Sequence, residues 1–253
     1  MPQELKIFLT AIMFYTRLPV PRIESYSEEY LNESLRYLPV VGWIVGLLTA
    51  VIFRLCLEIF PLPVAILLSM VAGIFFTGAF HEDAFTDTCD GLGGGWTKQE
   101  ILKIMKDSRV GAFGTIGIIL ILGLKFLCLW EIPYPQIPLI LFLGHTVSRT
   151  VILIFRYGRP YVGEEETSKS KLIARTMTEK SLFIGLGLGL APVFFFLGWK
   201  GFWFLAPVIL TQMAFGHYIF KRIGGFTGDC LGAIQQVCEV VFYLSSTVLW
   251  KYI

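Results

Sequence analysis

Charged residues are scarce in this sequence. Asp, Glu, Lys and Arg make up 16% of its 253 residues, against about 25% in an ordinary soluble domain. Hydrophobic residues make up 55%, which is more apolar surface than one soluble core of this length can bury. The net charge of +2 is too small to indicate a nucleic-acid-binding protein. The composition excludes an ordinary soluble domain and predicts an integral membrane protein.

Paired cysteines are also missing. The five cysteines show no C-x-x-C spacing, which argues against a zinc site and against a disulfide framework. A cleavable signal peptide is not expected either, because Glu4 stands where such a signal carries basic residues.

Long apolar runs are abundant, and they decide the fold class. A membrane span needs about 20 mostly apolar residues. We expect an all-α protein, a polytopic membrane helix bundle of about seven transmembrane helices, forming a single membrane-embedded catalytic domain over residues 1–253. A shorter apolar run, Leu5–Leu18, either spans the membrane or lies in the membrane–water interface as an amphipathic helix. The expected spans are 39–58, 62–80, 111–130, 136–155, 181–198, 203–220 and 235–250.

Basic residues divide unevenly between the two sides of this bundle. The three short connections, 60–63, 132–135 and 198–201, contain only Lys200. The connections on the other side contain fourteen Lys or Arg. The positive-inside rule therefore places that side, and the polar motifs on it, in the cytoplasm. The fourteen are Arg22, Arg36, Lys98, Lys103, Lys106, Arg109, Arg156, Arg159, Lys169, Lys171, Arg175, Lys180, Lys221 and Arg222.

An acidic stripe follows the second expected span, in a segment 81–95 that contains no Lys or Arg. On a helix turning about 100° per residue, Asp83, Asp87 and Asp90 project within about 60° of one another. Their mutual repulsion favours a bound cation, and carboxylate oxygens suit Mg²⁺, or Mn²⁺, better than zinc. Glu82 could join a second ion or orient a ligand. The plainer interpretation is a solvated acidic helix face.

A glycine cluster, Gly91–Gly95, ends the stripe. Glycine lets a backbone approach phosphate closely, so we expect Gly93 and Gly94 to contact substrate. A flexible turn is an equal alternative, because the cluster matches no known phosphate-loop pattern.

A polar quartet lies before the third expected span. Lys106 and Arg109 are suited to clamp phosphate oxygens, and Ser108 can donate a hydrogen bond. Asp107 would either complete a metal site or hold Arg109 in position. A flank that only satisfied the positive-inside rule would need the two cations but not Asp107 or Ser108.

Three further polar features lie later in the chain. Arg149 falls inside the fourth span, where an arginine is costly and usually functional, so we expect it to bind a substrate phosphate or a carboxylate. Lys125 lies near a span end, where snorkelling explains it. The Gly-rich block 224–233 contains Asp229, which could bind metal, bind a ribose or act as a base, or simply cap the last helix.

Together these motifs resemble the cobalamin synthase family, also called adenosylcobinamide-GDP ribazoletransferase. The resemblance runs in the same order from near residue 5 to near residue 245. This sequence departs from the family pattern at Ala84, where Gly is common, and at Gln235–Gln236, where an acidic residue is common. The blocks that carry the resemblance are Phe14–Pro21, His81–Gly95, Met105–Gly111, Ser148–Arg149, Arg159–Tyr161 and Gly225–Ala233.

The resemblance implies a Mg²⁺-dependent transferase of the bacterial inner membrane, with its active site facing the cytoplasm. It joins α-ribazole, or its 5′-phosphate, to adenosylcobinamide-GDP, and gives adenosylcobalamin, or its 5′-phosphate, and GMP. In that reaction His81 or Asp229 would serve as general base, and Thr227 would contact substrate. Membrane lipid surrounds the protein, and both a homo-oligomer and a complex with other cobalamin-pathway enzymes remain open.

Three other functions fit parts of the sequence. Prenyltransferases and CDP-alcohol phosphotransferases also bind metal diphosphates with helical carboxylates, but the former usually show two acidic blocks and the latter a wider spacing containing an Arg. A cation-coupled transporter would use the acidic site but leaves Lys106–Arg109 without a purpose.

Overall fold

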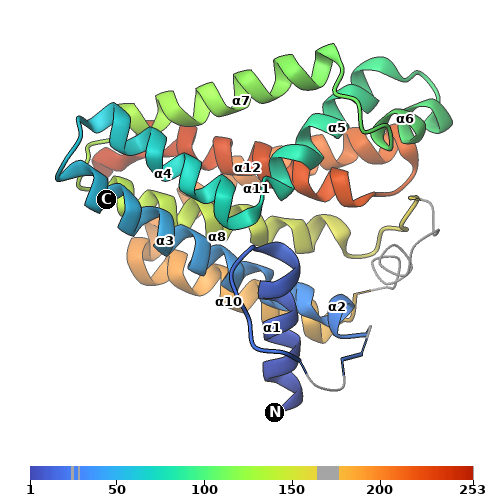
Figure 1. The fold of residues 1–253 in the computed structure, drawn as a ribbon, viewed down its shortest axis with the longest axis horizontal. Coiled ribbons are helices and arrows are strands. Elements are labelled where there is room, and N and C mark those ends of the chain that lie inside the picture. The colour runs from blue at the N-terminus through green and yellow to red at the C-terminus, as the bar shows by residue number, and fades with distance from the viewer. Residues whose placement is uncertain (24–25, 28, 164–176, 253) are drawn as a thin grey trace.

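The computed structural model describes residues 1–23, 26–27, 29–163 and 177–252, and the regular structure of these residues is helical (Figure 1). This confirms the all-α prediction. Lys169, Lys171 and Arg175 lie outside the described residues. The helices are α1 (Gln3–Tyr15), α2 (Glu29–Ser34), η1 (Leu35–Tyr37), α3 (Leu38–Leu57), α4 (Leu62–Thr77), α5 (Phe80–Gly94), α6 (Lys98–Met105), α7 (Ala112–Glu131), α8 (Ile137–Arg156), α10 (Glu179–Leu197), η2 (Gly198–Lys200), α11 (Gly201–Ile223), α12 (Gly228–Leu249) and η3 (Trp250–Tyr252).

Each of the seven expected spans coincides with one helix, namely α3, α4, α7, α8, α10, α11 and α12. The count of seven is not confirmed by length and hydropathy. Four stretches of the described chain pass as spans by these criteria, or five if the bent pair α4 and α5 forms one span. The four are Glu29–Leu57, Ala112–Glu131, Ile137–Arg156 and the α10–α11 stretch Glu179–Ile223. The short run that became α1 is not among them.

Helix α8 forms the centre of the bundle and is buried on nearly every side (Figure 1). Helix α3 crosses it closely through two glycines. A Cβ on Gly42 would lie 2.4 Å from the carbonyl oxygen of His145, and one on Gly46 would lie 2.8 Å from Cα of Phe142. Small residues four apart allow this contact between membrane helices.

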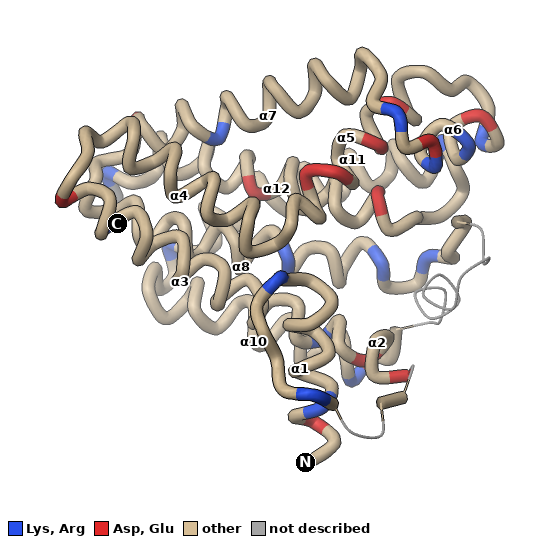
Figure 2. The backbone as a smooth tube through the Cα atoms, viewed as in Figure 1, with Lys and Arg blue, Asp and Glu red and all other residues tan. Residues whose placement is uncertain are grey.

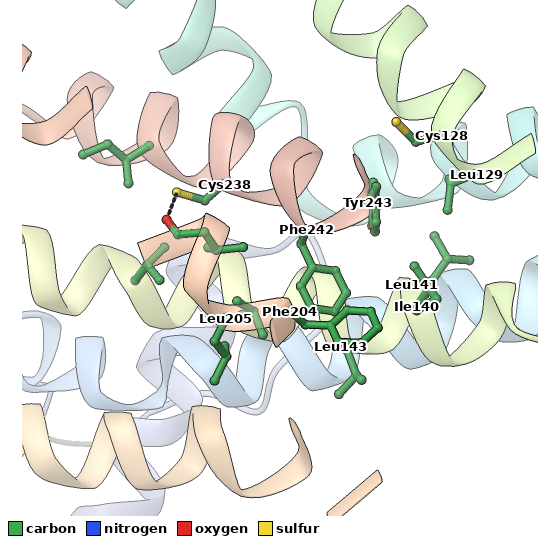
Figure 3. Close-up of a cluster of buried hydrophobic side chains, with 14 of the residues drawn as sticks. Cys128, Leu129, Ile140, Leu141, Leu143, Phe204, Leu205, Cys238, Phe242 and Tyr243 are labelled. Carbon is green, nitrogen blue, oxygen red and sulfur yellow. Dashed lines mark hydrogen bonds between the residues drawn. The ribbon is translucent and has the colours of Figure 1, made fainter. Parts of the chain in front are cut away.

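One apolar part of the core, shown in Figure 3, gathers residues of α7, α8, α11 and α12. Leu129 of α7, Leu141 of α8, Phe204 of α11 and Phe242 of α12 meet there, each at most 2% exposed. Cys238 points to the carbonyl oxygen of Val208 at 3.9 Å. The same cluster includes Ile101 and Met105 of α6, so apolar packing continues to the end of the bundle that carries the polar motifs.

A sharp bend separates α4 from the acidic helix α5. The two axes differ by 88°, and the turn uses left-handed backbone at Gly78 (φ 66°) and Ala79 (φ 57°). Left-handed φ is uncommon for a residue with a side chain such as Ala79. The backbone N–H of Arg17 donates to the carbonyl oxygen of Phe76 at 2.7 Å and so ties the N-terminal segment to this corner. The acidic stripe therefore lies on a separate helix and does not extend the α4 span. Charged residues gather around α5 and α6 (Figure 2).

Candidate active site

The five aspartates of the sequence all lie at the α5–α6 end of the bundle. Helix α5 carries three, the α6–α7 loop carries one, and the first turn of α12 carries Asp229. Thr227 is the N-cap of α12, and its hydroxyl accepts from the backbone N–H of Cys230 at 3.3 Å. The cap expected at Asp229 is therefore wrong, which leaves Asp229 available for another role.

Asp83, Asp87 and Asp229 form a carboxylate edge between α5 and α12. Burial, followed by the charges of Asp229, Asp83 and Asp90, raises the pKa of Asp87 to about 7. Burial is also the main reason that the pKa of Asp229 is raised to about 6, and the Asp83 charge adds to it. Close approach of α5 to α12 brings the groups together, since a Cβ on Gly232 would lie 2.4 Å from Cβ of Ala84.

The carboxylate edge fits Mg²⁺ by donor chemistry, but it is not a preassembled metal centre. Among the described residues, no group of three or more His, Cys, Asp or Glu could hold a metal ion. Mg²⁺ usually binds one or two protein carboxylates and completes its shell with water and substrate phosphate. Asp83 and Asp87 could supply that pair. Their repulsion would be relieved by a cation.

Asp90 has a different environment from the one its place in the stripe predicts. Its carboxylate oxygens accept backbone N–H groups of Gly111 at 2.7 Å and Gly114 at 2.8 Å, and the residue is only 8% exposed. The start of α7 is thereby bonded to α5, where an acid also complements the helix dipole. In this structure Asp90 anchors α7, so a metal-binding role for it is not supported.

Glu82 and His81 turn away from the carboxylate edge. Glu82 accepts a hydrogen bond from Nε2 of Gln236 at 2.9 Å, inside the bundle. His81 is 2% exposed and packs edge-on against Phe80. At about 100° per residue His81 stands about 160° from Asp83, so the sequence itself carried the signal against His81 as the base at this edge.

The glycine cluster is helical and does not form a loop. Gly91–Gly94 end α5, and a Cβ on Gly93 would lie 2.5 Å from the ring of Phe113. A Cβ on Gly95 would lie 2.7 Å from the backbone nitrogen of Ile101. These glycines allow α5, α6 and α7 to pack closely. Gly94 is exposed, and among the nearest atoms only Ile104 lies as close as 3.4 Å to its would-be Cβ.

The loop between α6 and α7 presents Arg109. Oδ1 of Asp107 accepts from the backbone N–H of Arg109 at 3.1 Å, and Oδ2 accepts from Nη2 at 2.6 Å. These hydrogen bonds lower the pKa of Asp107 to about 2. The Arg109 side chain is 87% exposed, and Lys106 and Ser108 are exposed beside it. Of the two roles expected for Asp107, the structure supports holding Arg109.

Comparison with known proteins identifies the family of this chain. The chain matches the profile of the cobalamin-5-phosphate synthase family over residues 7–247. It belongs to this family. A protein of Shewanella frigidimarina named adenosylcobinamide-GDP ribazoletransferase is 42% identical over 245 residues, covering 96% of this chain and 94% of its own. Proteins of the same name from Vibrio parahaemolyticus and Shewanella amazonensis are 41% and 40% identical, each covering at least 95% of both chains. No solved structure matches this chain significantly.

This cobalamin-5-phosphate synthase family member also carries charge inside its bundle. Arg149 is 1% exposed, and its Nη1 lies 3.1 Å from both Nδ1 and the carbonyl oxygen of His145. The snorkelling explanation for Lys125 is wrong, because its Nζ lies 2.9 Å from Oε1 of Glu239 and it is 5% exposed. Sequence reasoning missed this pair. The sequence pattern that could have revealed it is an acidic residue, Glu239, in one expected span and a basic residue, Lys125, in another.

Proposed function

We propose that this chain is an adenosylcobinamide-GDP ribazoletransferase, which joins α-ribazole, or its 5′-phosphate, to adenosylcobinamide-GDP and releases GMP. One observation carries the proposal. Two of the blocks that resemble the family, His81–Gly95 and Gly225–Ala233, bring Asp83, Asp87 and Asp229 together at one carboxylate edge. The α6–α7 loop, which carries Arg109, is hydrogen-bonded to α5 through Asp90.

The diphosphate of the donor would bind at the carboxylate edge. Asp83 and Asp87 would hold Mg²⁺, or Mn²⁺, which supplies charge neutralisation to the diphosphate. Arg109, held in position by its hydrogen bonds to Asp107, is suited to bind the departing guanosine phosphate with two hydrogen bonds. Lys106 and Ser108 are exposed in the same loop and would bind further phosphate oxygens.

The chemistry is a substitution at phosphorus. A ribose hydroxyl of the acceptor attacks the phosphorus joined to cobinamide, and a new O–P bond forms. The bond from that same phosphorus to the bridging oxygen of the diphosphate breaks, and its electron pair stays on this oxygen, which leaves as part of GMP. Asp229 takes the hydroxyl proton, since its raised pKa of about 6 lies near the working pH of a general base. Positioning and charge stabilisation supply most of the rate in such reactions.

The carboxylate edge would face the cytoplasm at the inner membrane. Lys98, Lys103, Lys106 and Arg109 lie on or beside α6, at the same end as the aspartates (Figure 2). An excess of basic residues marks the cytoplasmic side of membrane proteins. Soluble nucleotide substrates would then reach the site without crossing the bilayer.

The test is GMP release by the lipid-reconstituted protein with Asp87→Asn. We expect turnover to fall on the order of 100-fold at saturating Mg²⁺, about 2.7 kcal/mol. Glu58→Gln, at the opposite end of the bundle, is the matched control and should be unaffected. Turnover of Asp87→Asn within about threefold of wild type would remove Asp87 from the site. Product formation from a CDP-alcohol or a prenyl diphosphate, with none from adenosylcobinamide-GDP, would overturn the function.

A further inference from the structure

A charged cluster lies inside the bundle, apart from the carboxylate edge. We call it the ion cluster; it is centred on Glu239 of α12, which is 2% exposed. Lys125 Nζ lies 2.9 Å from Oε1 of Glu239, and the Tyr243 hydroxyl donates to that oxygen at 3.2 Å. His145 Nδ1 lies 3.4 Å from Oε2, which also accepts from the Gln235 amide. The ion cluster thus joins α7, α8 and α12.

Next to the ion cluster, one further hydrogen bond joins α12 to the acidic helix α5. Gln236, next to Gln235 on α12 and 1% exposed, donates to Glu82 at 2.9 Å. Gln235 also donates to the Ser148 hydroxyl on α8 at 2.9 Å. The family pattern commonly has an acidic residue at this pair of positions, whereas an amide here can donate to a carboxylate without needing a cation.

Polar atoms are left over around these bonds. Arg149 Nε, Gln235 Oε1, Gln236 Oε1 and Glu82 Oε2 are buried without a hydrogen-bond partner. All four residues line one chamber of about 30 Å³, room for about two water molecules. Buried polar atoms normally find partners, so the chamber is suited to hold water that completes the network.

Stability alone does not account for the ion cluster. Charges within a membrane are costly, and apolar residues of similar volume often replace a buried ion pair without loss of stability. The core around the ion cluster is largely apolar, so apolar residues at the positions of the charged ones would pack against it. A function for the cluster is therefore the better explanation.

Helix α5 is held by side-chain hydrogen bonds near both of its ends. It has 15 residues, begins at the left-handed bend and carries Asp83 and Asp87 between two anchors. The C-terminal anchor is Asp90, which accepts a hydrogen bond from the backbone N–H of Gly111 just before α7. The N-terminal anchor is Glu82, which accepts a hydrogen bond from Gln236 of α12, beside the ion cluster.

We propose that the ion cluster and the Glu82–Gln236 bond are positioning elements, which fix α5 against α12 so that Asp83 and Asp87 face Asp229. The proposal rests on the proposed function for its kinetic readout, but its structural readout is independent. In this proposal Gln236 and Glu239 are not substrate ligands. Gln236 acts on α5 through Glu82. Glu239 acts by holding α12 against α7 and α8.

The experiment uses the full chain in lipid nanodiscs with two variants. Gln236→Leu removes the N-terminal anchor and leaves the Lys125–Glu239 pair in place. The double variant Lys125→Met, Glu239→Gln removes both charges together, so that no unpaired charge remains. Gln212→Leu on α11 is the matched control, because Gln212 is also buried, at 2% exposed, and lies outside the ion cluster.

Two readouts are taken from each variant. We expect backbone amides of residues 83–90 to exchange with deuterium at least about tenfold faster in both variants, while those of α8 are unchanged. We expect kcat to fall at least about tenfold, with KM within about threefold. Gln212→Leu should match wild type in both readouts.

Wild-type exchange and wild-type kcat in Gln236→Leu would overturn the proposal, whether or not the double variant folds. Faster exchange throughout the bundle would also overturn it, because that result describes a purely structural role. If wild type forms no GMP, the proposed function fails, and the exchange of 83–90 still decides the positioning claim.

Discussion

The carboxylate of Asp90 accepts a 2.8 Å hydrogen bond from the backbone N–H of Gly114, 24 residues further along the chain. A Cβ at residue 114 would lie 2.4 Å from Oδ2 of Asp90. We therefore expect Gly114→Ala to destabilise the protein by about 1–3 kcal/mol, measured as thermal unfolding in detergent. Gly123→Ala on the same helix meets nothing within 4 Å and should be neutral or slightly stabilising. Equal unfolding temperatures for the two variants would contradict the anchor.

Stability should depend on pH through Asp87. Its pKa is about 7 in the folded protein against 3.8 for an ordinary Asp, so the folded state binds the proton more tightly. This contribution to stability is complete below about pH 4 and is lost as the pH rises through about 7. In metal-free buffer we expect wild type to lose more unfolding temperature between pH 5 and pH 8 than Asp87→Asn does. A parallel loss in both proteins would refute this origin.

Divalent cations should reverse that loss. A cation that binds the ionised carboxylate edge stabilises the folded state by mass action. At pH 8 we expect millimolar Mg²⁺ to raise the unfolding temperature of wild type and to have little effect on Asp87→Asn. Chelation should remove the increase. An equal increase in both proteins would point to a site elsewhere.

The pH dependence of the reaction rate should report the ionisation of Asp229. If Asp229 accepts the proton, kcat/KM should rise with pH through about 6 and then level off. Asp229→Asn should lower kcat on the order of 100-fold or more and abolish the inflection. Steady-state GMP release between pH 5 and 8 measures both. An inflection near 6 that survives in Asp229→Asn would assign it to another group.

Arg109 should matter for turnover and not for folding. Its side chain is 87% exposed and bonded only to Asp107 among the contacts described above. We expect Arg109→Ala to lower kcat/KM on the order of 100-fold with an unchanged unfolding temperature, and Arg109→Lys to recover only part of it, since lysine lacks the planar fork. Arg54→Ala, exposed on α3, is the control.

The helices could be predicted from the sequence because apolar runs record membrane thickness directly. The run 111–130 became Ala112–Glu131, and 136–155 became Ile137–Arg156. The bend at Gly78–Ala79 could not be predicted, since a left-handed alanine has no sequence signature. The expected second span continued to residue 80, whereas α4 stops at Thr77.

For the site, helical periodicity identified the face of Asp83 and Asp87 correctly but could not identify what opposes it. Asp90 shares that face, yet its partners are backbone groups of Gly111 and Gly114, which no spacing rule reveals. Lys125 and Glu239 meet across two helices far apart in sequence. Such pairings depend on how helices pack in three dimensions, which one sequence does not record.

The central place of α8 determines which parts of the protein the lipid can contact. In the apolar window of α8, 78% of residues are buried, against 28% in α7. Phe113, Ile119 and Leu127 of α7 point outward. A hydrophobic photoreactive probe dissolved in the acyl chains would therefore tag α7 heavily and leave α8 almost untouched. Arg149 of α8 is thus shielded from lipid by the other helices of its own chain.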